Sequence, residues 1–216
     1  MVFSLRQLVS SKKGISPKSK GYAMLKLIDY IKGASAMLIQ DEVLYLRPVT
    51  PQDAEAIHAS VTEPEIRYLT GTHSLFTVEQ VRQHIVTCED DDSRIDFAVC
   101  LREDDTMIGE GGIVEIDVIN QLAYFRIAML GMKNTGKGYG TRAVLLAVRY
   151  VFDVLKLNRL QLEVYSHNPH AKRSYEKVGF QVEGILREKL LWDGVYSDEI
   201  VMSILRKDYE KKGTAQ

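Results

Sequence analysis

Cysteine, tryptophan and long apolar stretches are scarce in this chain of 216 residues. It has two cysteines, Cys88 and Cys100, and a single tryptophan. The cysteines show neither a metal-ligand nor a redox spacing, so we expect reduced, buried thiols in a cytoplasmic protein. No uninterrupted apolar run approaches the roughly 20 residues of a membrane helix. The nearest candidate, 22–39, is interrupted by Lys26 and Asp29, which also argues against a secretory signal.

The net charge of −1 conceals an uneven distribution. Residues 1–40 carry a net charge of +6, whereas residues 41–216 carry a net charge of −7. We therefore expect a basic, loosely docked or helical N-terminal extension over 1–40, one domain over 41–210 and a short tail over 211–216. A basic arm on an acidic body also admits a nucleic-acid partner, but no known nucleic-acid motif is present and we do not expect one. The five histidines show no metal-ligand spacing, so we expect no metal.

A glycine-rich segment is the most informative part of the chain. Residues 133–143 read KNTGKGYGTRA and lie between an apolar, strand-like run at 122–130 and a helix-like run at 144–157. Glycines at alternate positions let the backbone adopt positive φ and approach a ligand closely. A helix that begins there directs unpaired N–H groups and its positive dipole end at the loop. The segment therefore predicts a site for a phosphorylated cofactor.

Strand-like and helix-like segments follow one another irregularly along the rest of the chain. Thr50 and Thr77 are typical helix N-caps, and Gly179 is a typical helix C-cap. Asp193-Gly194 predicts a tight hairpin between two strands. Strands are expected at 43–47, 95–101, 107–118, 122–130, 159–165, 186–192 and 196–205. Adjacent strands joined by tight turns favour an α+β fold over a doubly wound parallel sheet.

Three cofactor sites are compatible with the glycine-rich segment. A P-loop would start at Gly131, but Gly138 stands where its Mg²⁺-binding hydroxyl should be. A dinucleotide-binding turn would use Gly138, Gly140 and Ala143, but at least five residues separate the preceding strand from its first glycine. The third candidate is a site for the pyrophosphate of coenzyme A.

Two signatures carry a family resemblance that favours the third site. Residues 135–143 resemble motif A of the GNAT acyltransferases, Q/R-x-x-G-x-G/A, with Thr135 at the first position. Residues 168–180, NPHAKRSYEKVGF, resemble the second signature, N-x-x-A-x-x-x-Y-x-K-x-G-F. Residues 183–188 and 192–198 are similar to patterns of the ribosomal-protein N-terminal acetyltransferases and of the bacterial spermidine acetyltransferases. The resemblance runs from about Val43 to Tyr209.

The resemblance implies a GNAT fold, with a mixed, mostly antiparallel sheet of about six to seven strands and about four flanking helices. It implies acetyl-CoA as co-substrate, held where the strands at 122–130 and 159–165 splay apart. Exposed strand backbone would pair with the pantetheine amides, and the N–H groups of the glycine loop would hold the pyrophosphate. The implied cofactor-binding residues are Ile127, Met129, Leu130, Thr135, Gly136, Lys137, Gly138, Tyr139, Gly140, Thr141, Asn168 and Tyr175.

Tyr175 occupies the position that the family uses for proton donation to the leaving sulfur, and the resemblance makes it the expected general acid. The general base is open, because the segment 122–130 has no acidic residue. Glu110 and Glu115 on the preceding strand are candidates, and we favour Glu110. His73 and His84 are further candidates.

An N-acetyltransferase acting on a primary amine is therefore expected, with a protein N-terminal α-amino group as the first acceptor. A polyamine or an antibiotic is the alternative acceptor, and a non-catalytic acyl-CoA-binding protein is an alternative of another class. Acceptor specificity should come from 57–76 and from the hairpin around Asp193. The C-terminal strands could pair across a homodimer, and no membrane partner is expected.

Overall fold

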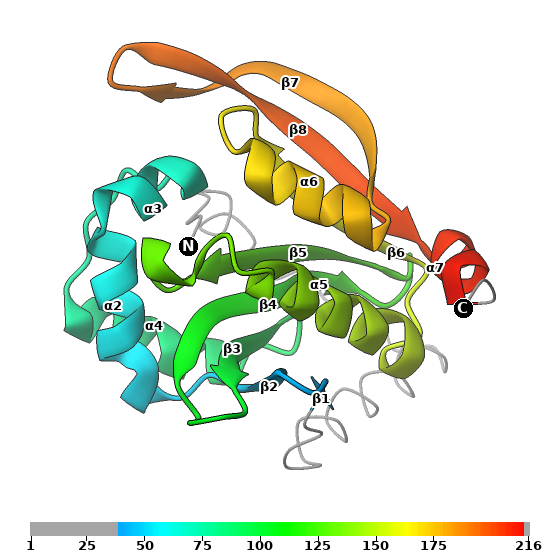
Figure 1. The fold of residues 1–216 in the computed structure, drawn as a ribbon, viewed down its shortest axis with the longest axis horizontal. Coiled ribbons are helices and arrows are strands. Elements are labelled where there is room, and N and C mark those ends of the chain that lie inside the picture. The colour runs from blue at the N-terminus through cyan, green and yellow to red at the C-terminus, as the bar shows by residue number, and fades with distance from the viewer. Residues whose placement is uncertain (1–38, 214–216) are drawn as a thin grey trace.

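The computed structural model describes residues 39–213, which form one open sheet with helices on both faces (Figure 1). The sheet has eight strands in the order β1-β2-β3-β4-β5-β6-β8-β7. The strands are β1 Ile39–Gln40, β2 Leu44–Pro48, β3 Ile95–Leu101, β4 Met107–Asp117, β5 Leu122–Met129, β6 Arg159–Tyr165, β7 Gln181–Trp192 and β8 Val195–Leu205. All neighbouring strands are antiparallel except β5 and β6. The predicted α+β fold is confirmed, with eight strands in place of six to seven.

Six α-helices lie in the described residues, where the sequence predicted about four. They are α2 Ala54–Thr62, α3 Pro64–Thr70, α4 Val78–Glu89, α5 Tyr139–Arg149, α6 Pro169–Val178 and α7 Arg206–Gly213. Short 3-10 turns occupy Pro51–Asp53 and Met132–Asn134, and a π-helical turn extends α5 over Tyr150–Val154. The extra helices are α3, whose seven residues are too few for a clear apolar period, and the polar α7. The expected N-terminal extension lies outside the described residues, apart from the two residues of β1.

The helices form two layers around the sheet. Helices α5 and α6 lie across the face that is turned to the viewer in Figure 1, and α5 packs against α6. The expected apolar stripe of α5, which includes Val144, Val148 and Val151, is fully buried in the main core. Helices α2 and α4 pack against each other and form a second, smaller apolar cluster.

Local signals fix most of the element ends. The Thr77 side chain accepts a hydrogen bond from the Gln80 N–H at 3.2 Å, and the Gln80 side chain accepts one from the Thr77 N–H at 2.8 Å. This capping box satisfies two donors that the first turn of α4 would otherwise leave unpaired. Asp193 and Gly194 have φ of 47° and 81°, as a two-residue hairpin turn requires.

The β7–β8 hairpin is the most extended feature of the molecule. It projects past α6 at the top of Figure 1, and its tip lies on the same side as α3. Strand β7 is the edge of the sheet, and most of its side chains are exposed. Within residues 39–213, no helix is both long and apolar enough to cross a membrane.

Candidate functional site

The parallel strands β5 and β6 separate after three residue pairs. Leu122, Ala123 and Tyr124 pair with 159–161, and beyond them β5 continues to Met129 with no registered partner on β6. The predicted splay at this point is confirmed. The Leu130 N–H donates to the Ile108 carbonyl of β4 at 2.8 Å. Because backbone groups alternate along a strand, those of Ile127 and Met129 face the opening.

Backbone atoms at the end of β5 already have several partners. The Leu130 carbonyl accepts a hydrogen bond from Asn134 Nδ2 at 2.5 Å, so both polar groups of Leu130 are used within the chain. The Met129 carbonyl accepts a 3.3 Å hydrogen bond from Ser60 Oγ of α2. Leu130 was expected to bind the cofactor through its backbone, but its N–H and carbonyl both bond within the chain. Ile127 and Met129 are the expected residues whose backbone faces the opening.

The glycine loop forms an open anion site at the start of α5. Gly136 and Gly138 have φ of 73° and 82°, and no atom lies within 4 Å of the position that a Cβ would occupy on either. No side chain caps the helix at Gly138, and in the described chain Arg142 is the first residue of α5 whose N–H reaches a helical carbonyl, that of Gly138. A row of N–H groups and the positive end of α5 thus face empty space, which fits a pyrophosphate.

Two residues next to this loop, Thr135 and Arg142, already have partners within the chain. The Thr135 N–H and Oγ1 both donate to the Met132 carbonyl, at 3.0 and 2.8 Å, so the open N–H groups begin at Gly136. Arg142 forms ion pairs with Asp41 at 2.9 Å and Glu42 at 2.7 Å, and its charge is neutralised there. Lys137 stays exposed.

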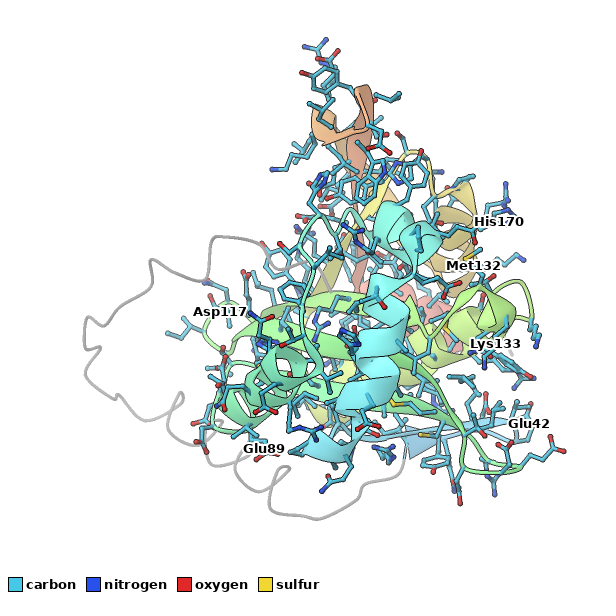
Figure 2. All side chains as sticks on the ribbon, turned by 90° about the vertical axis from the view of Figure 1, so that its left-hand side faces the viewer. Glu42, Glu89, Asp117, Met132, Lys133 and His170 are labelled. Carbon is cyan, nitrogen blue, oxygen red and sulfur yellow. The ribbon has the colours of Figure 1, made fainter. Side chains whose placement is uncertain are left out.

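Helix α6 follows β6 and carries the expected acid. Asn168 caps this helix, since its Oδ1 accepts a hydrogen bond from the Ala171 N–H at 3.1 Å. Figure 2 shows His170, in the first turn of α6, and Met132 and Lys133 of the loop after β5 on the same side of the molecule. The α6 side of the splay therefore lies beside the anion site.

Tyr175 is buried in α6 with 8% of its surface exposed, and its ring packs at 5.9 Å from that of Phe180. Burial raises the pKa of Tyr175 to about 12. No enclosed side-chain nitrogen or oxygen of the described residues lacks a hydrogen-bond partner. No hydrogen bond of the Tyr175 hydroxyl occurs within 39–213, so the described residues do not fully enclose this hydroxyl. It is a protonated donor at every physiological pH.

Glu110 lies in a buried network of four charges. Arg126 of β5 contacts Glu110 at 3.1 Å and Asp96 at 2.6 Å, and Arg94 contacts Asp96 at 2.6 Å. Burial alone would raise the pKa of Asp96, but hydrogen bonding by Arg94 and the charge of Arg126 hold it below its usual value. The carboxylate of Glu110 is thus held by a guanidinium, an environment that suits a structural ion pair better than a proton acceptor.

The other proposed bases lie in three different surroundings. Glu115 is exposed at an irregularity of β4, where its φ is 50°. His84 of α4 faces the charge network, and burial together with the charge of Arg94 lowers its pKa. His73 stacks on Trp192 at 4.7 Å. Among the described residues, no group of three or more His, Cys, Asp or Glu side chains could hold a metal ion.

Sequence reasoning assigned acceptor specificity to 57–76 and to the hairpin, but it missed His167 and the contacts that join α3, the end of β6 and the hairpin tip into one wall. Tyr68 stacks on His167 at 4.1 Å, and Trp192 meets Tyr68 edge-on at 5.8 Å. The Arg67 guanidinium lies 5.7 Å from the centre of the Trp192 ring. These residues are far apart in the chain, and nothing in their local sequence links them. Arg67 and Tyr68 belong to the segment 57–76, and Trp192 lies next to the turn at Asp193, so both expected specificity regions contribute to this wall.

An open glycine loop at the start of a helix, next to a splayed pair of parallel strands, fits an acyl-CoA-dependent transferase. Residues 44–181, nearly two thirds of the chain, match the family model described as an acetyltransferase (GNAT) domain. The chain belongs to the GNAT acetyltransferase family. It is an N-acetyltransferase that uses acetyl-CoA, and the P-loop and dinucleotide alternatives are wrong.

Relatives cover nearly the same part of the chain. The probable N-acetyltransferase YjcK of Bacillus subtilis is 30% identical over 181 residues, which are 81% of this chain and 100% of that protein. The putative ribosomal N-acetyltransferase YdaF of B. subtilis is 24% identical over 179 residues, 79% of this chain and 95% of its own. A crystal structure of spermidine N-acetyltransferase from Vibrio cholerae in complex with CoA and spermine aligns with a TM-score of 0.73 and 27% identity. That alignment covers 79% of this chain and 99% of the V. cholerae chain.

Proposed function

We propose that this enzyme acetylates a primary amine of a flexible, cationic acceptor of the polyamine class. The observation that carries the proposal is the similarity to a spermidine N-acetyltransferase that was solved with CoA and spermine. Carboxylates near the expected acceptor wall support it. Glu163 and Glu199 lie on the same sheet face as Tyr165. Burial is the main cause that raises the pKa of Tyr165 to about 12, and the negative charges of Glu199 and Glu163 raise it further. A field of this sign attracts ammonium groups.

The geometry supports the following roles for the site residues. The N–H groups of 136–141 would hold the phosphates of acetyl-CoA, and the backbone of Ile127 and Met129 would orient its pantetheine arm. Bound acetyl-CoA supplies an activated acyl group, which a neutral amine attacks directly. The Tyr175 hydroxyl would donate a hydrogen bond to the sulfur as negative charge develops there.

Glu110 has a supporting role in this proposal. Its carboxylate would hold Arg126, and so the end of β5, in place rather than accept the proton of the amine. The cap made by Asn168 would fix the start of the helix that carries Tyr175. The amine proton would then leave to solvent, or to a carboxylate near Tyr165.

A protein N-terminal α-amino group is the second candidate acceptor. The similarity to a putative ribosomal N-acetyltransferase favours it. Independently of the acceptor, the β7–β8 hairpin exposes large apolar side chains. These are Val182, Ile185, Leu186, Leu191, Val195 and Tyr196.

We further propose a catalytic domain over 41–210 and a homodimer that covers this hairpin surface. Exposed apolar residues on both strands of an edge hairpin need a covering partner. Arg187, Glu188 and Lys189 place charges of both signs side by side on β7, as a self-complementary interface requires. Light scattering of the purified chain gives the oligomeric state directly.

A thiol-release assay distinguishes the acceptors. Release of CoA from acetyl-CoA is followed with spermidine, with an aminoglycoside and with peptides that begin with Ala or Ser. Turnover with spermidine and none with the peptides is the expected result, and the reverse would replace the first candidate by the second. Binding of acetyl-CoA without turnover of any amine would refute both.

A further inference from the structure

One histidine joins three elements at the acceptor side of the site. His167 lies between β6 and α6, directly before the cap of the catalytic helix. Its Nε2 lies 2.8 Å from the Tyr68 carbonyl of α3, and its Nδ1 lies 3.0 Å from Ser197 Oγ of β8. Because a carbonyl can only accept, Nε2 carries the proton in that bond. In the neutral ring, Nδ1 then accepts from the serine hydroxyl.

The partner of His167 on α3 is a carbonyl of the last turn, that of Tyr68, which also accepts a 3.2 Å hydrogen bond from the Gly71 N–H of the C-cap. The last carbonyls of a helix have no intrahelical donor and must find one elsewhere. His167 serves the Tyr68 carbonyl, and Asn168 Nδ2 approaches the Leu69 carbonyl at 3.4 Å. The C-terminal end of α3 is thus capped by two consecutive side chains of the segment that starts the catalytic helix.

Ring packing strengthens the same junction. The His167 ring lies between Tyr68, at 4.1 Å, and Tyr165, at 5.5 Å, with interplanar angles of 18° and 7°. Gly71, the left-handed C-cap of α3, lies so close to Tyr165 that a Cβ there would be 2.5 Å from the ring. The junction therefore fixes both the position and the orientation of the end of α3.

Helix α3 depends on such external contacts. It has seven residues, fewer than an isolated helix needs for stability in water. It also packs against α2, and Trp192 at the hairpin tip contacts Tyr68 and lies near the Arg67 guanidinium. The contacts of His167 and Asn168 link α3 to the start of the helix of Tyr175.

We propose that His167 is a positioning residue that holds α3, the acceptor-side wall, in register with the catalytic helix. It sets the affinity for the amine and leaves acetyl-CoA binding unchanged, because its hydrogen bonds and ring contacts within residues 39–213 go to α3, β6 and β8 and not to the glycine loop or β5. The inference rests on the proposed function in one respect, the use of spermidine as the amine in the kinetic test.

The test uses His167→Phe, which keeps a ring between the two tyrosines and removes both hydrogen bonds. We expect the KM for spermidine to rise about ten-fold, the change that the loss of one to two ordinary hydrogen bonds gives. The Kd of acetyl-CoA, measured by calorimetry, should stay within two-fold. Backbone amides at the end of α3, those of Arg67, Gly71 and Thr72, should exchange their hydrogens faster, and those of α5 should not.

Two further variants make the result specific. His167→Gln can restore the donor to the Tyr68 carbonyl and should recover part of the KM. His170→Phe alters an exposed histidine of the first turn of α6 and should change neither KM nor exchange. Unchanged exchange in α3 of His167→Phe would overturn the proposal, as would an equal loss of acetyl-CoA affinity. Exchange needs no acceptor, so an inactive spermidine assay refutes the proposed acceptor and not the role of His167.

Discussion

Replacement of Tyr175 by Phe tests the chemistry of the site most directly. The Tyr175 ring is enclosed by the core and packs on Phe180, and no hydrogen bond within the described chain depends on its hydroxyl. Tyr175→Phe therefore removes the oxygen that we propose acts on the sulfur and leaves the packing intact. Folding stability should change little, so any loss of turnover reports on the hydroxyl.

The pKa of Tyr175 sets the magnitude of the effect. A phenol of pKa about 12 is roughly 3.5 units weaker as an acid than a thiol of about 8.5, so full transfer of its proton to the thiolate would be uphill by about 5 kcal/mol. Donation of a hydrogen bond to the developing thiolate avoids this cost. Such a charge-assisted bond contributes about 1.5–3 kcal/mol, which corresponds to roughly a 10- to 150-fold loss of kcat.

The assay measures kcat by thiol release and the Kd of acetyl-CoA by calorimetry. Tyr150→Phe is a matched control, because burial also raises the pKa of Tyr150 to about 12 while its ring lies in the core under the sheet. We expect a large fall in kcat for Tyr175→Phe alone, with the Kd within two-fold. If Tyr175→Phe retained more than half of the kcat, the tyrosine would have no role in expulsion of the thiolate.

Three other perturbations test separate parts of the molecule. Arg126→Met leaves the carboxylate of Glu110 buried without its cation, and urea denaturation should show a loss of about 3–5 kcal/mol. Gly138→Ala forces a side chain into positive φ and into the open space of the anion loop. The Kd of the Gly138→Ala variant for acetyl-CoA should rise at least ten-fold. Gly194→Ala is the control: its φ of 81° in the hairpin turn should lower the folding stability by a similar amount, but its Kd should not rise. Because burial raises the pKa of Tyr175 to about 12, the unfolded chain releases this phenolic proton before the folded one. The free energy of unfolding should therefore fall as pH rises from about 10 to 12, in urea titrations at each pH.

The cofactor half of the site could be predicted because its signals are local. Glycines at alternate positions, the helix that follows them and the apolar strand before them are contiguous in the sequence. Their geometry is set by backbone sterics and by helix ends, which do not depend on distant contacts. The parallel neighbours at 122–130 and 159–165 were expected from the family resemblance, and the structure pairs them over 122–124 and 159–161. The roles of the individual site residues stay predictions.

The acceptor half could not be predicted because it is made of contacts between distant segments. His167 meets a carbonyl 99 residues earlier in the chain, and Ser197 lies 30 residues beyond it. The pairing of Glu110 with Arg126 also depends on strand register, which two bulges of β4 shift. A single sequence contains the residues of such contacts but not the register and crossing that bring them together.

The pairing of Glu110 bears on which amines the enzyme can use. An α-amino group of pKa about 7.7–8.0 is roughly 10–20% neutral at pH 7, but a polyamine nitrogen near 10.4 is neutral only about once in 2,500, a deficit of about 4.6 kcal/mol. A carboxylate held by Arg126 supplies little of this difference. A polyamine acceptor must therefore lose its proton to solvent or to the carboxylates near Tyr165, where negative charge also favours the ammonium form. Binding of the cation and activation of its nitrogen thus oppose each other at this wall. Several nitrogens on one acceptor resolve the conflict, since one can remain bound as ammonium while another is neutral and attacks.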